Sequence, residues 1–257
     1  MKVPILMYHR ISKSANEQRY TVTPSKFEQQ MKFLDTKGYN VISLDSLSDA
    51  IDGIVTLPRN SVVITFDDGF QETFDYACPV LKRLRFTATF FLVTKLMGKT
   101  NEWMPQHRGI RLPLMRWTDA RWLLAEGFEV GSHTATHPVL PEINPAAARQ
   151  EIEESKRELE DQLGMAIRFF AYPYGRLDRT VQDLVRESGY AAACSTRAGF
   201  NGVEVDRFVL RRLDIHGTDS LGNFRRNLIF GENQMSLSRL TGYYGRRVAN
   251  KFSRFPH

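Results

Sequence analysis

The sequence has few cysteines and no long apolar run. Its two cysteines, Cys78 and Cys194, are far apart and form neither a disulfide framework nor a metal site with ligand spacing. We expect both to be buried apolar side chains. No stretch approaches the ~18 apolar residues of a membrane-spanning helix. The apolar N-terminal stretch ends at Tyr8-His9-Arg10 and is too short for a secretory signal, so a cytoplasmic protein is expected.

Internal repeats, low-complexity tracts and a convincing linker are also absent. The chain has 257 residues, of which 42% are hydrophobic and 25% charged, and suits one α/β barrel or two ordinary globular domains. The net charge of +6 is a mild excess that lies largely late in the chain. A basic surface can attract nucleic acid, anionic lipid or an anionic glycan. We interpret this excess as a solvated surface and expect no nucleic-acid partner.

Short apolar, β-branched runs alternate with helical patterns. Residues 62–66 and 87–93 are typical of strands that are buried on both faces. Helices are expected after Thr23-Pro24 and after Asn144-Pro145, where a capping side chain precedes a proline at the first helical position. Seven or so strand–helix units predict a closed or nearly closed parallel barrel, whose functional residues gather at the carboxyl ends of the strands.

Three segments are less regular. Residues 10–22 are polar and are expected to form a loop. The helical region after residue 66 is expected to be interrupted at Pro79. Residues 95–114 lack periodicity, which predicts a long loop near the site that could act as a lid.

Two adjacent carboxylates, Asp67 and Asp68, follow the strand at 62–66. Like charges this close disfavour joint ionisation, and a bound cation would relieve that cost. Gly69 permits the tight turn that could bring both carboxylates to one pocket. An ordinary capped turn is the alternative, since Asp-Gly is a common turn pair.

Two histidines, His133 and His137, follow the strand expected at 128–130. In a helical turn, residues four apart lie on one face, so these imidazoles could bind one metal ion. With one carboxylate from Asp67-Asp68 they form a ligand set that leaves positions open for water and substrate. A divalent metal lowers the pKa of bound water toward ~7, and the spare aspartate can then accept the proton as a general base.

A third stretch, Tyr172-Pro173-Tyr174-Gly175, follows another expected strand. By itself it is best interpreted as a structural turn with aromatic packing. Beside a metal site, Tyr172 and Pro173 could form a platform for a sugar. The backbone N–H of Tyr174 could then lie where an oxyanion develops.

A general acid must protonate a leaving amine, and histidine suits that role near neutral pH. His9 follows the first strand and His216 follows the last, so both are expected at the same rim. His107 lies in the long loop and is expected at the surface.

These motifs resemble those of the polysaccharide deacetylases of carbohydrate esterase family 4. The sequence Thr65-Phe66-Asp67-Asp68-Gly69 is similar to the first family motif, residues 132–137 to the second, and residues 172–175 to the end of the third. The resemblance extends from about residue 3 to about residue 216. The opening Leu6-Met7-Tyr8-His9 resembles a permuted branch that includes the poly-N-acetylglucosamine deacetylases.

The resemblance implies a distorted (β/α) barrel and a hydrolase that deacetylates N-acetylated sugars of a polysaccharide or lipid-linked glycan. It implies Asp67 as the base and Tyr174 N–H as an oxyanion donor. The divalent metal, usually zinc, would have three ligands: Asp68, His133 and His137.

The permuted branch takes its acid from the first strand, which favours His9 and leaves His216 as an alternative acid or a substrate contact. The family commonly has an arginine three residues before the tyrosine of the third motif, where it orients the base. Here that position is Ala171. Three other arginines could substitute: Arg168, Arg211 or Arg212.

Two other functions stay open at this point. A non-haem iron oxygenase also uses two histidines and one carboxylate, although usually on an antiparallel β scaffold. A barrel that had lost its activity would bind a glycan without hydrolysing it.

Residues 1–222 are expected to form the barrel, and residues 223–257 a basic C-terminal extension rich in arginine and aromatic residues. The extension could lie on an anionic membrane surface and meet lipid-linked sugars. Packing against the barrel is the alternative.

Overall fold

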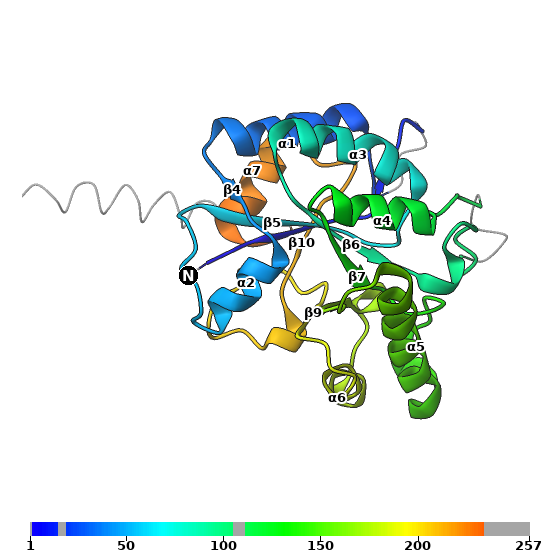
Figure 1. The fold of residues 1–257 in the computed structure, drawn as a ribbon. Helices are drawn as coiled ribbons and strands as arrows, with labels where there is room; N and C mark the ends of the chain where they lie inside the picture. The colour runs from blue at the N-terminus through cyan, green and yellow to red at the C-terminus, as the bar shows by residue number, and fades with distance from the viewer. Residues whose placement is uncertain (1, 15–18, 105–110, 234–257) are drawn as a thin grey trace, which may run out of the picture.

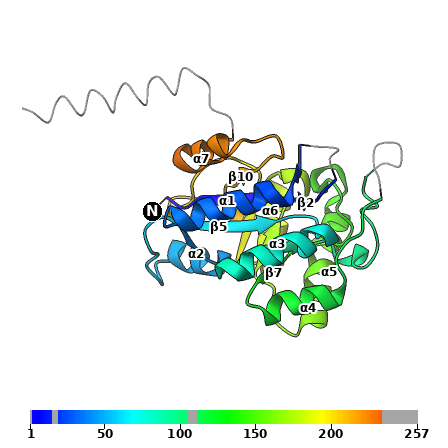
Figure 2. The same ribbon diagram turned by 90° about the horizontal axis from the view of Figure 1, so that it is seen from above.

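The computed structural model describes residues 2–14, 19–104 and 111–233. Within these ranges a curled parallel sheet is surrounded by helices (Figures 1 and 2). The strands of the sheet are β1 (Ile5–Tyr8), β4 (Asn40–Val41), β5 (Ser61–Phe66), β6 (Thr89–Leu92), β7 (Glu129–Ser132), β8 (Phe169–Ala171), β9 (Ala192–Cys194) and β10 (Leu213–Asp214).

The strands follow the order β10-β1-β5-β6-β7-β8-β9, with β4 beside β5. All neighbouring pairs are parallel. An isolated parallel bridge joins Cys194, at the end of β9, to Leu210, just before β10, so the two ends of the sheet approach each other. The prediction of a distorted barrel of about seven parallel strands is confirmed, and all carboxyl strand ends lie along one rim.

The helices cover the sheet (Figure 1). They are α1 (Pro24–Thr36), α2 (Leu44–Ile51), α3 (Gln71–Leu84), α4 (Trp117–Ala125), α5 (Pro145–Leu163), α6 (Arg179–Glu187) and α7 (Leu221–Phe230). The short 3-10 turns are η1 (Thr94–Leu96), η2 (Leu140–Glu142), η3 (Pro173–Gly175) and η4 (Arg207–Val209). The two expected caps are present, because Thr23 accepts from the Lys26 N–H and Asn144 from the Ala147 N–H.

Two expectations about irregular segments were wrong. The polar stretch at 10–22 contains a parallel pair of short strands, β2 (Arg10–Ile11) and β3 (Thr21–Val22). Helix α3 runs without interruption through Pro79. Proline removes one helical hydrogen bond, but α3 buries residues on both sides of it, including Cys78 and Val80, so packing overrides the local penalty.

The core divides between the two faces of the sheet. On β5, Val62, Ile64 and Phe66 belong to the largest apolar cluster, whereas Val63 packs in a second cluster. Side chains alternate along a strand, so Asp67 continues the side of Val63. Both cysteines are free and buried, as predicted.

Helix α7 begins before residue 223 and therefore spans the expected boundary between barrel and extension. Its Phe224 is fully buried, and the ring lies 6.1 Å from that of Phe33 on α1. The rest of the proposed extension, residues 234–257, lies outside the described residues. None of the helices in the described ranges is both long and apolar enough to cross a bilayer.

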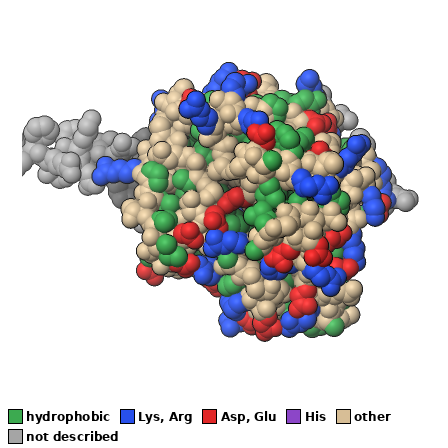
Figure 3. All heavy atoms as spheres, viewed as in Figure 1, with side chains coloured by type: hydrophobic (Ala, Val, Ile, Leu, Met, Phe, Trp, Pro, Cys, Tyr) green, Lys and Arg blue, Asp and Glu red, His purple; other side chains and the backbone are tan. Residues whose placement is uncertain are grey.

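The described surface mixes charges of both signs (Figure 3). Residues 223–257 contain seven Arg or Lys and one Glu, which accounts for the whole net charge of +6.

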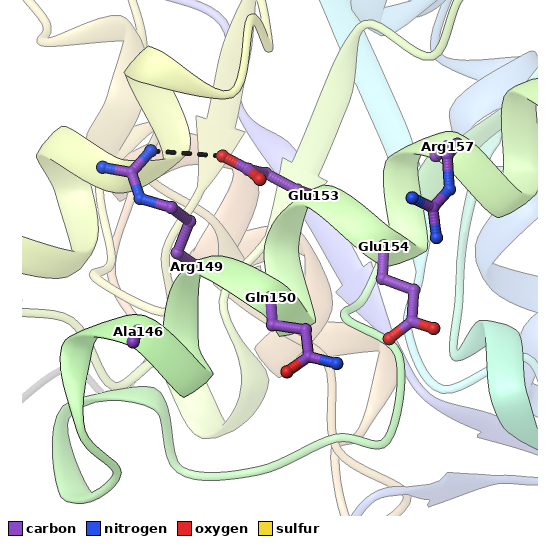
Figure 4. A pocket seen from close by; sticks show the side chains of 6 residues that line it. All are labelled: Ala146, Arg149, Gln150, Glu153, Glu154 and Arg157. Carbon is purple, nitrogen blue, oxygen red and sulfur yellow. Dashed lines mark hydrogen bonds and ion pairs between the residues drawn. The ribbon is translucent and has the colours of Figure 1, made fainter.

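A shallow hollow on the outside of α5 is shown in Figure 4. It is lined by residues of that one helix: Ala146, Arg149, Gln150, Glu153, Glu154 and Arg157. Arg149 pairs there with Glu153, four residues on, which is typical of a solvated helix face.

Candidate active site

Three side chains from two strand-end loops converge at the rim of the sheet. The Asp68 Oδ1 lies 3.5 Å from His133 Nε2 and 3.3 Å from His137 Nε2. The two Nε2 atoms are 3.2 Å apart. Metal–ligand bonds of about 2.0–2.2 Å in a tetrahedral zinc site separate the ligand atoms by about 3.3 Å. Asp68, His133 and His137 therefore have the spacing of a divalent metal site.

The turn after β5 directs Asp68 toward the histidines. Asp68 and Gly69 both have left-handed backbone, with φ of 73° and 72°. A Cβ at Gly69 would meet Leu92 Cδ2 at 3.0 Å. The left-handed backbone favours glycine at this position, as the sequence indicated, and a larger residue would also press on the Leu92 side chain.

The loop that carries the histidines is not the helical turn that was expected. Residues 133–137 contain no helix, and Thr134 and His137 each have a φ of 68°. A carboxylate from α5 holds the loop, because Glu151 accepts from the N–H groups of Ala135 and Thr136 at 3.0 and 2.8 Å. The spacing of four residues was informative, but a tight bend rather than a helix face brings the imidazoles together.

Asp67 is held by an arginine from the far end of the barrel sequence. Both Asp67 oxygens accept from Arg212, at 2.6 Å from Nη1 and 2.7 Å from Nη2. The Arg212 side chain is fully buried, and its Nε donates to the Ser195 carbonyl at 2.9 Å. Of the three arginines considered for the position that Ala171 leaves open, the structure selects Arg212.

The other two arginines lie elsewhere. Arg168 forms ion pairs with Asp45 and Asp49 of α2. The Arg211 side chain packs beside Gly199. Strand β10 pairs with β1, which in turn pairs with β5, so the long Arg212 side chain can reach Asp67 at the end of β5. No local sequence pattern predicts that pairing.

The surroundings keep both carboxyls ionised at neutral pH. Burial raises the pKa of Asp67, but the charge of Arg212 and then that of His133 outweigh it, so the pKa is lowered. Burial also raises the pKa of Asp68, and hydrogen bonds from His133 and His137 bring it well below its usual range. Because Arg212 neutralises the charge of Asp67, the negative charge that faces the two imidazoles comes chiefly from Asp68.

The two imidazoles differ in their surroundings. Burial lowers the pKa of His133, but the hydrogen bond with Asp68 and the nearby aspartate charges give a net increase. Burial dominates at His137 and lowers its pKa. The His133 Nδ1 lies 2.8 Å from the Ala171 carbonyl, which can only accept, so Nδ1 carries the proton and Nε2 is free to bind a metal.

The two candidate acids, His9 and His216, contact the same tyrosine. The Tyr20 ring lies 4.8 Å from the His9 ring and 5.9 Å from the His216 ring. The His216 Nε2 is occupied by Asp214 Oδ2 at 2.7 Å and Arg19 Nε at 3.1 Å. The buried His9 Nδ1 has no hydrogen-bond partner among the described residues.

The two tyrosines of the turn after β8 differ in burial, because Tyr172 lies in the core and Tyr174 at the surface. Tyr172 is fully buried, and its hydroxyl donates to the Phe208 carbonyl at 3.0 Å. Pro173 is buried as well. Neither side chain is placed to form the expected sugar platform, because both are used in packing. Tyr174 is 51% exposed, with a φ of 57°, and its ring lies 4.6 Å from His137.

Sequence reasoning missed two aromatic residues at the site. Tyr20 lies between the two candidate acids, and Trp103 stacks on His137 with ring centroids 4.5 Å apart. Trp103 belongs to the stretch that was predicted to be a loop near the site, which was the available signal. His107 and the rest of residues 105–110 lie outside the described residues, so the lid stays a prediction.

Comparisons with known proteins agree with this geometry. The sequence profile described as polysaccharide deacetylase matches residues 55–193. A putative polysaccharide deacetylase of Bacillus subtilis, YxkH, is 27% identical over 214 residues, which cover 83% of this chain and 71% of the relative. The poly-beta-1,6-N-acetyl-D-glucosamine N-deacetylase of Staphylococcus epidermidis is 27% identical over 210 residues, covering 72% of this chain and 68% of that protein.

Solved structures superpose on this chain over most of its length. The deacetylase PplD of Streptococcus pyogenes, in complex with acetate, superposes with a TM-score of 0.78 at 26% identity over 90% of this chain and 99% of the other. IcaB from Ammonifex degensii superposes with a TM-score of 0.74 at 25% identity, covering 90% and 97%. With the family profile spanning more than half of its length, this chain belongs to the polysaccharide deacetylase family.

Proposed function

We propose that the protein is a metal-dependent hydrolase that removes the acetyl group from N-acetylated sugars of a polysaccharide or lipid-linked glycan and releases acetate. The observation that carries the proposal is the cluster of Asp68, His133 and His137, with the neighbouring Asp67 held separately by Arg212. The names of the relatives support the choice of substrate, since one is an N-deacetylase of poly-N-acetylglucosamine.

We propose zinc as the ion, because two imidazoles and one carboxylate with an open position are typical of catalytic zinc sites. When bound, a divalent ion supplies Lewis-acid polarisation of the amide carbonyl and a water of lowered pKa. The residues that would hold it are Asp68, His133 and His137, of which His133 is oriented through the Ala171 carbonyl.

The proton transfers are assigned to the remaining side chains. Asp67 accepts a proton from a water molecule as the oxygen of that water attacks the acetyl carbon. The two hydrogen bonds from Arg212 fix the orientation of the Asp67 carboxylate. The backbone N–H of Tyr174 donates to the oxyanion. His9 gives a proton to the sugar nitrogen as the C–N bond breaks, which leaves a free amine and acetate.

His9 suits the role of general acid better than His216. The His216 Nε2 is already engaged by Asp214 and Arg19. His9 follows β1 at the carboxyl rim of the sheet, and its buried Nδ1 has no hydrogen-bond partner among the described residues. His216 is assigned to the wall of the substrate site behind Tyr20.

Exposed aromatic rings at the site favour a glycan. Tyr20 and Tyr174 are the two aromatic residues with the most exposed side chains among the described large hydrophobics, at 45% and 51%. Each contacts a site histidine, His9 in one case and His137 in the other. Aromatic rings combine apolar area with polar tips and serve as platforms for amphipathic ligands.

The two alternatives from the sequence are less favoured. An iron oxygenase was expected on antiparallel strands, whereas all strands of this sheet are parallel. A non-catalytic barrel was suggested by the missing arginine at position 171, but Arg212 supplies that contact.

The test is acetate release from a panel of N-acetylated oligosaccharides and lipid-linked sugars. We expect release with added zinc, loss after treatment with a chelator, and recovery when the ion is restored. Release that persists at the same rate in chelator contradicts the metal-dependent mechanism, and binding without release from the whole panel supports the non-catalytic alternative.

For residues 223–257 we propose a peripheral contact with an anionic membrane surface. Their net charge of +6 and the exposed Leu221 and Ile229 on α7 support it. Flotation with vesicles containing phosphatidylserine should require residues 234–257. Equal flotation of the full chain and a chain truncated after residue 233 would contradict the contact.

A further inference from the structure

The two histidines of the candidate metal site are oriented by different means. The His133 ring is fixed by the hydrogen bond between Nδ1 and the Ala171 carbonyl. The His137 Nδ1 is buried and has no hydrogen-bond partner among the described residues. A metal-binding histidine normally gains its orientation and basicity through that second nitrogen. Some other contact must therefore orient His137.

Two aromatic rings make that contact. The Trp103 indole stacks on the His137 imidazole with centroids 4.5 Å apart and an angle of 26° between the planes. The Tyr174 ring meets the same imidazole edge-on, at 4.6 Å and 73°. Tyr174 is half exposed, so the indole is the better-anchored of the two rings.

Trp103 is itself held by a small apolar cluster beside the site. Phe70, Val93, Leu96 and Leu114 form this cluster, and Trp103 packs against it. The chain segments around Trp103 are joined by an antiparallel bridge between Thr100 and Pro113 and by the hydrogen bond from Leu114 N–H to the Lys99 carbonyl.

The same segment is tied to the turn that carries Asp68. The Met115 N–H donates to the Gly69 carbonyl at 2.8 Å, and Phe70 forms an antiparallel bridge with Leu114. The apolar cluster thus links two ligand-bearing segments, one through Phe70 and the other through Trp103 on His137.

We propose that Trp103 is a positioning residue that sets the metal affinity of the site by holding the His137 imidazole in its ligating orientation. A stacked indole limits rotation of the ring, and its π face attracts an imidazole that becomes more positive when it binds a cation. The inference rests on the proposed function, because it assumes that the site binds a divalent ion.

The test is the zinc dissociation constant, measured by competition with a chromophoric chelator on the full chain. Trp103→Ala should weaken binding by about 10- to 100-fold, the usual effect of removing a group that orients a ligand. Trp103→Phe should retain most of the affinity, because a phenyl ring can still stack. The matched control is Trp122→Phe, since Trp122 packs on Phe74 and Phe128 in another cluster.

A second measurement does not depend on how well the alanine variant folds. Zinc should change the tryptophan fluorescence of the wild type and of Trp122→Phe, and the change should disappear in Trp103→Phe. Wild-type affinity in Trp103→Ala, or a zinc-dependent change that survives in Trp103→Phe, overturns the proposal. A wild-type chain that binds no divalent ion contradicts the proposed function itself, which separates the two failures.

Discussion

Asp67 and Asp68 are adjacent in sequence and both buried, yet their partners differ in kind. Asp67 is paired with the fixed charge of Arg212, whereas Asp68 faces two imidazoles. The left-handed turn at Asp68 and Gly69 separates the two side chains. The comparison shows how one strand end can supply both a permanently paired carboxylate and a carboxylate that is available to an exchangeable cation.

The largest effects on metal content and activity are expected from substitutions of Asp68 and the two histidines that it faces. Removing one ligand, by Asp68→Asn or His133→Ala, should eliminate bound zinc and with it detectable acetate release, because the remaining ligands cannot hold the ion in place. Elemental analysis and the acetate assay measure the two effects. Unchanged metal content in either variant would show that the residue is not a ligand.

Substitution on the Asp67 side should separate catalysis from metal binding. In Asp67→Asn we expect kcat to fall by about 10²- to 10⁴-fold, the usual contribution of a positioned general base. Zinc content should stay close to one ion per chain, because Asp67 is not in the ligand cluster. A near-normal rate would refute the assignment of Asp67 as the base.

Arg212→Met tests the pairing of Asp67 through stability. Leaving a buried carboxylate without its partner should lower the free energy of unfolding by about 3–5 kcal/mol, measured by urea denaturation of the zinc-free protein. Arg211→Met is the matched control, because that neighbouring arginine is exposed and makes no contact with Asp67 among the described interactions. Equal losses in the two variants would contradict the special role of Arg212.

The Asp67–Arg212 pair also predicts how the free energy of unfolding changes with pH. The pKa of Asp67 is lower in the folded protein than the value of about 3.9 in an unfolded chain. Its contribution to stability is therefore complete above about pH 4 and is lost as the pH falls through the folded value. The stability difference between wild type and Arg212→Met should be largest near neutral pH and shrink below about pH 4. A difference that grows on acidification would contradict this linkage.

The smallest effect is expected from substitution of Tyr20, the exposed ring beside the two candidate acids. Tyr20→Ala should raise KM for an N-acetylated oligosaccharide by several-fold, because it removes one exposed ring whose contact with a ligand is worth about 0.5–1.5 kcal/mol. The effect on a monosaccharide should be smaller. Tyr39→Ala, at a ring that packs on Phe33 away from the site, is the control. Identical changes for both substrates would argue against a platform at Tyr20.

The motif residues were predictable because their types and their positions after a strand can be recognised from a few neighbouring residues. Asp68, His133 and His137 are adjacent to strand ends, and carboxyl ends of parallel strands share one rim. The strand pattern therefore places all three residues on one rim of the sheet. The geometry of the histidine loop did not follow, since four-residue spacing fits a helical turn as well as a bend held by Glu151.

Other features depended on contacts between distant segments. Tyr172 and Tyr174 are two residues apart in one motif, but the first is fully buried and the second half exposed. Trp103 stacks on His137 although neither its spacing nor its neighbours in sequence relate it to the second motif. Local patterns carry no information about such pairings.

The sequence by itself determined the alternation of strands and helices, the rim on which the site lies, and the residues able to bind a metal there. Only the tertiary structure decided which arginine pairs with Asp67 and which aromatic ring stacks on His137. The physical reason is that strand pattern and turn chemistry act over a few residues. The position of Arg212 depends on β10 closing beside β1, more than 140 residues along the chain from Asp67.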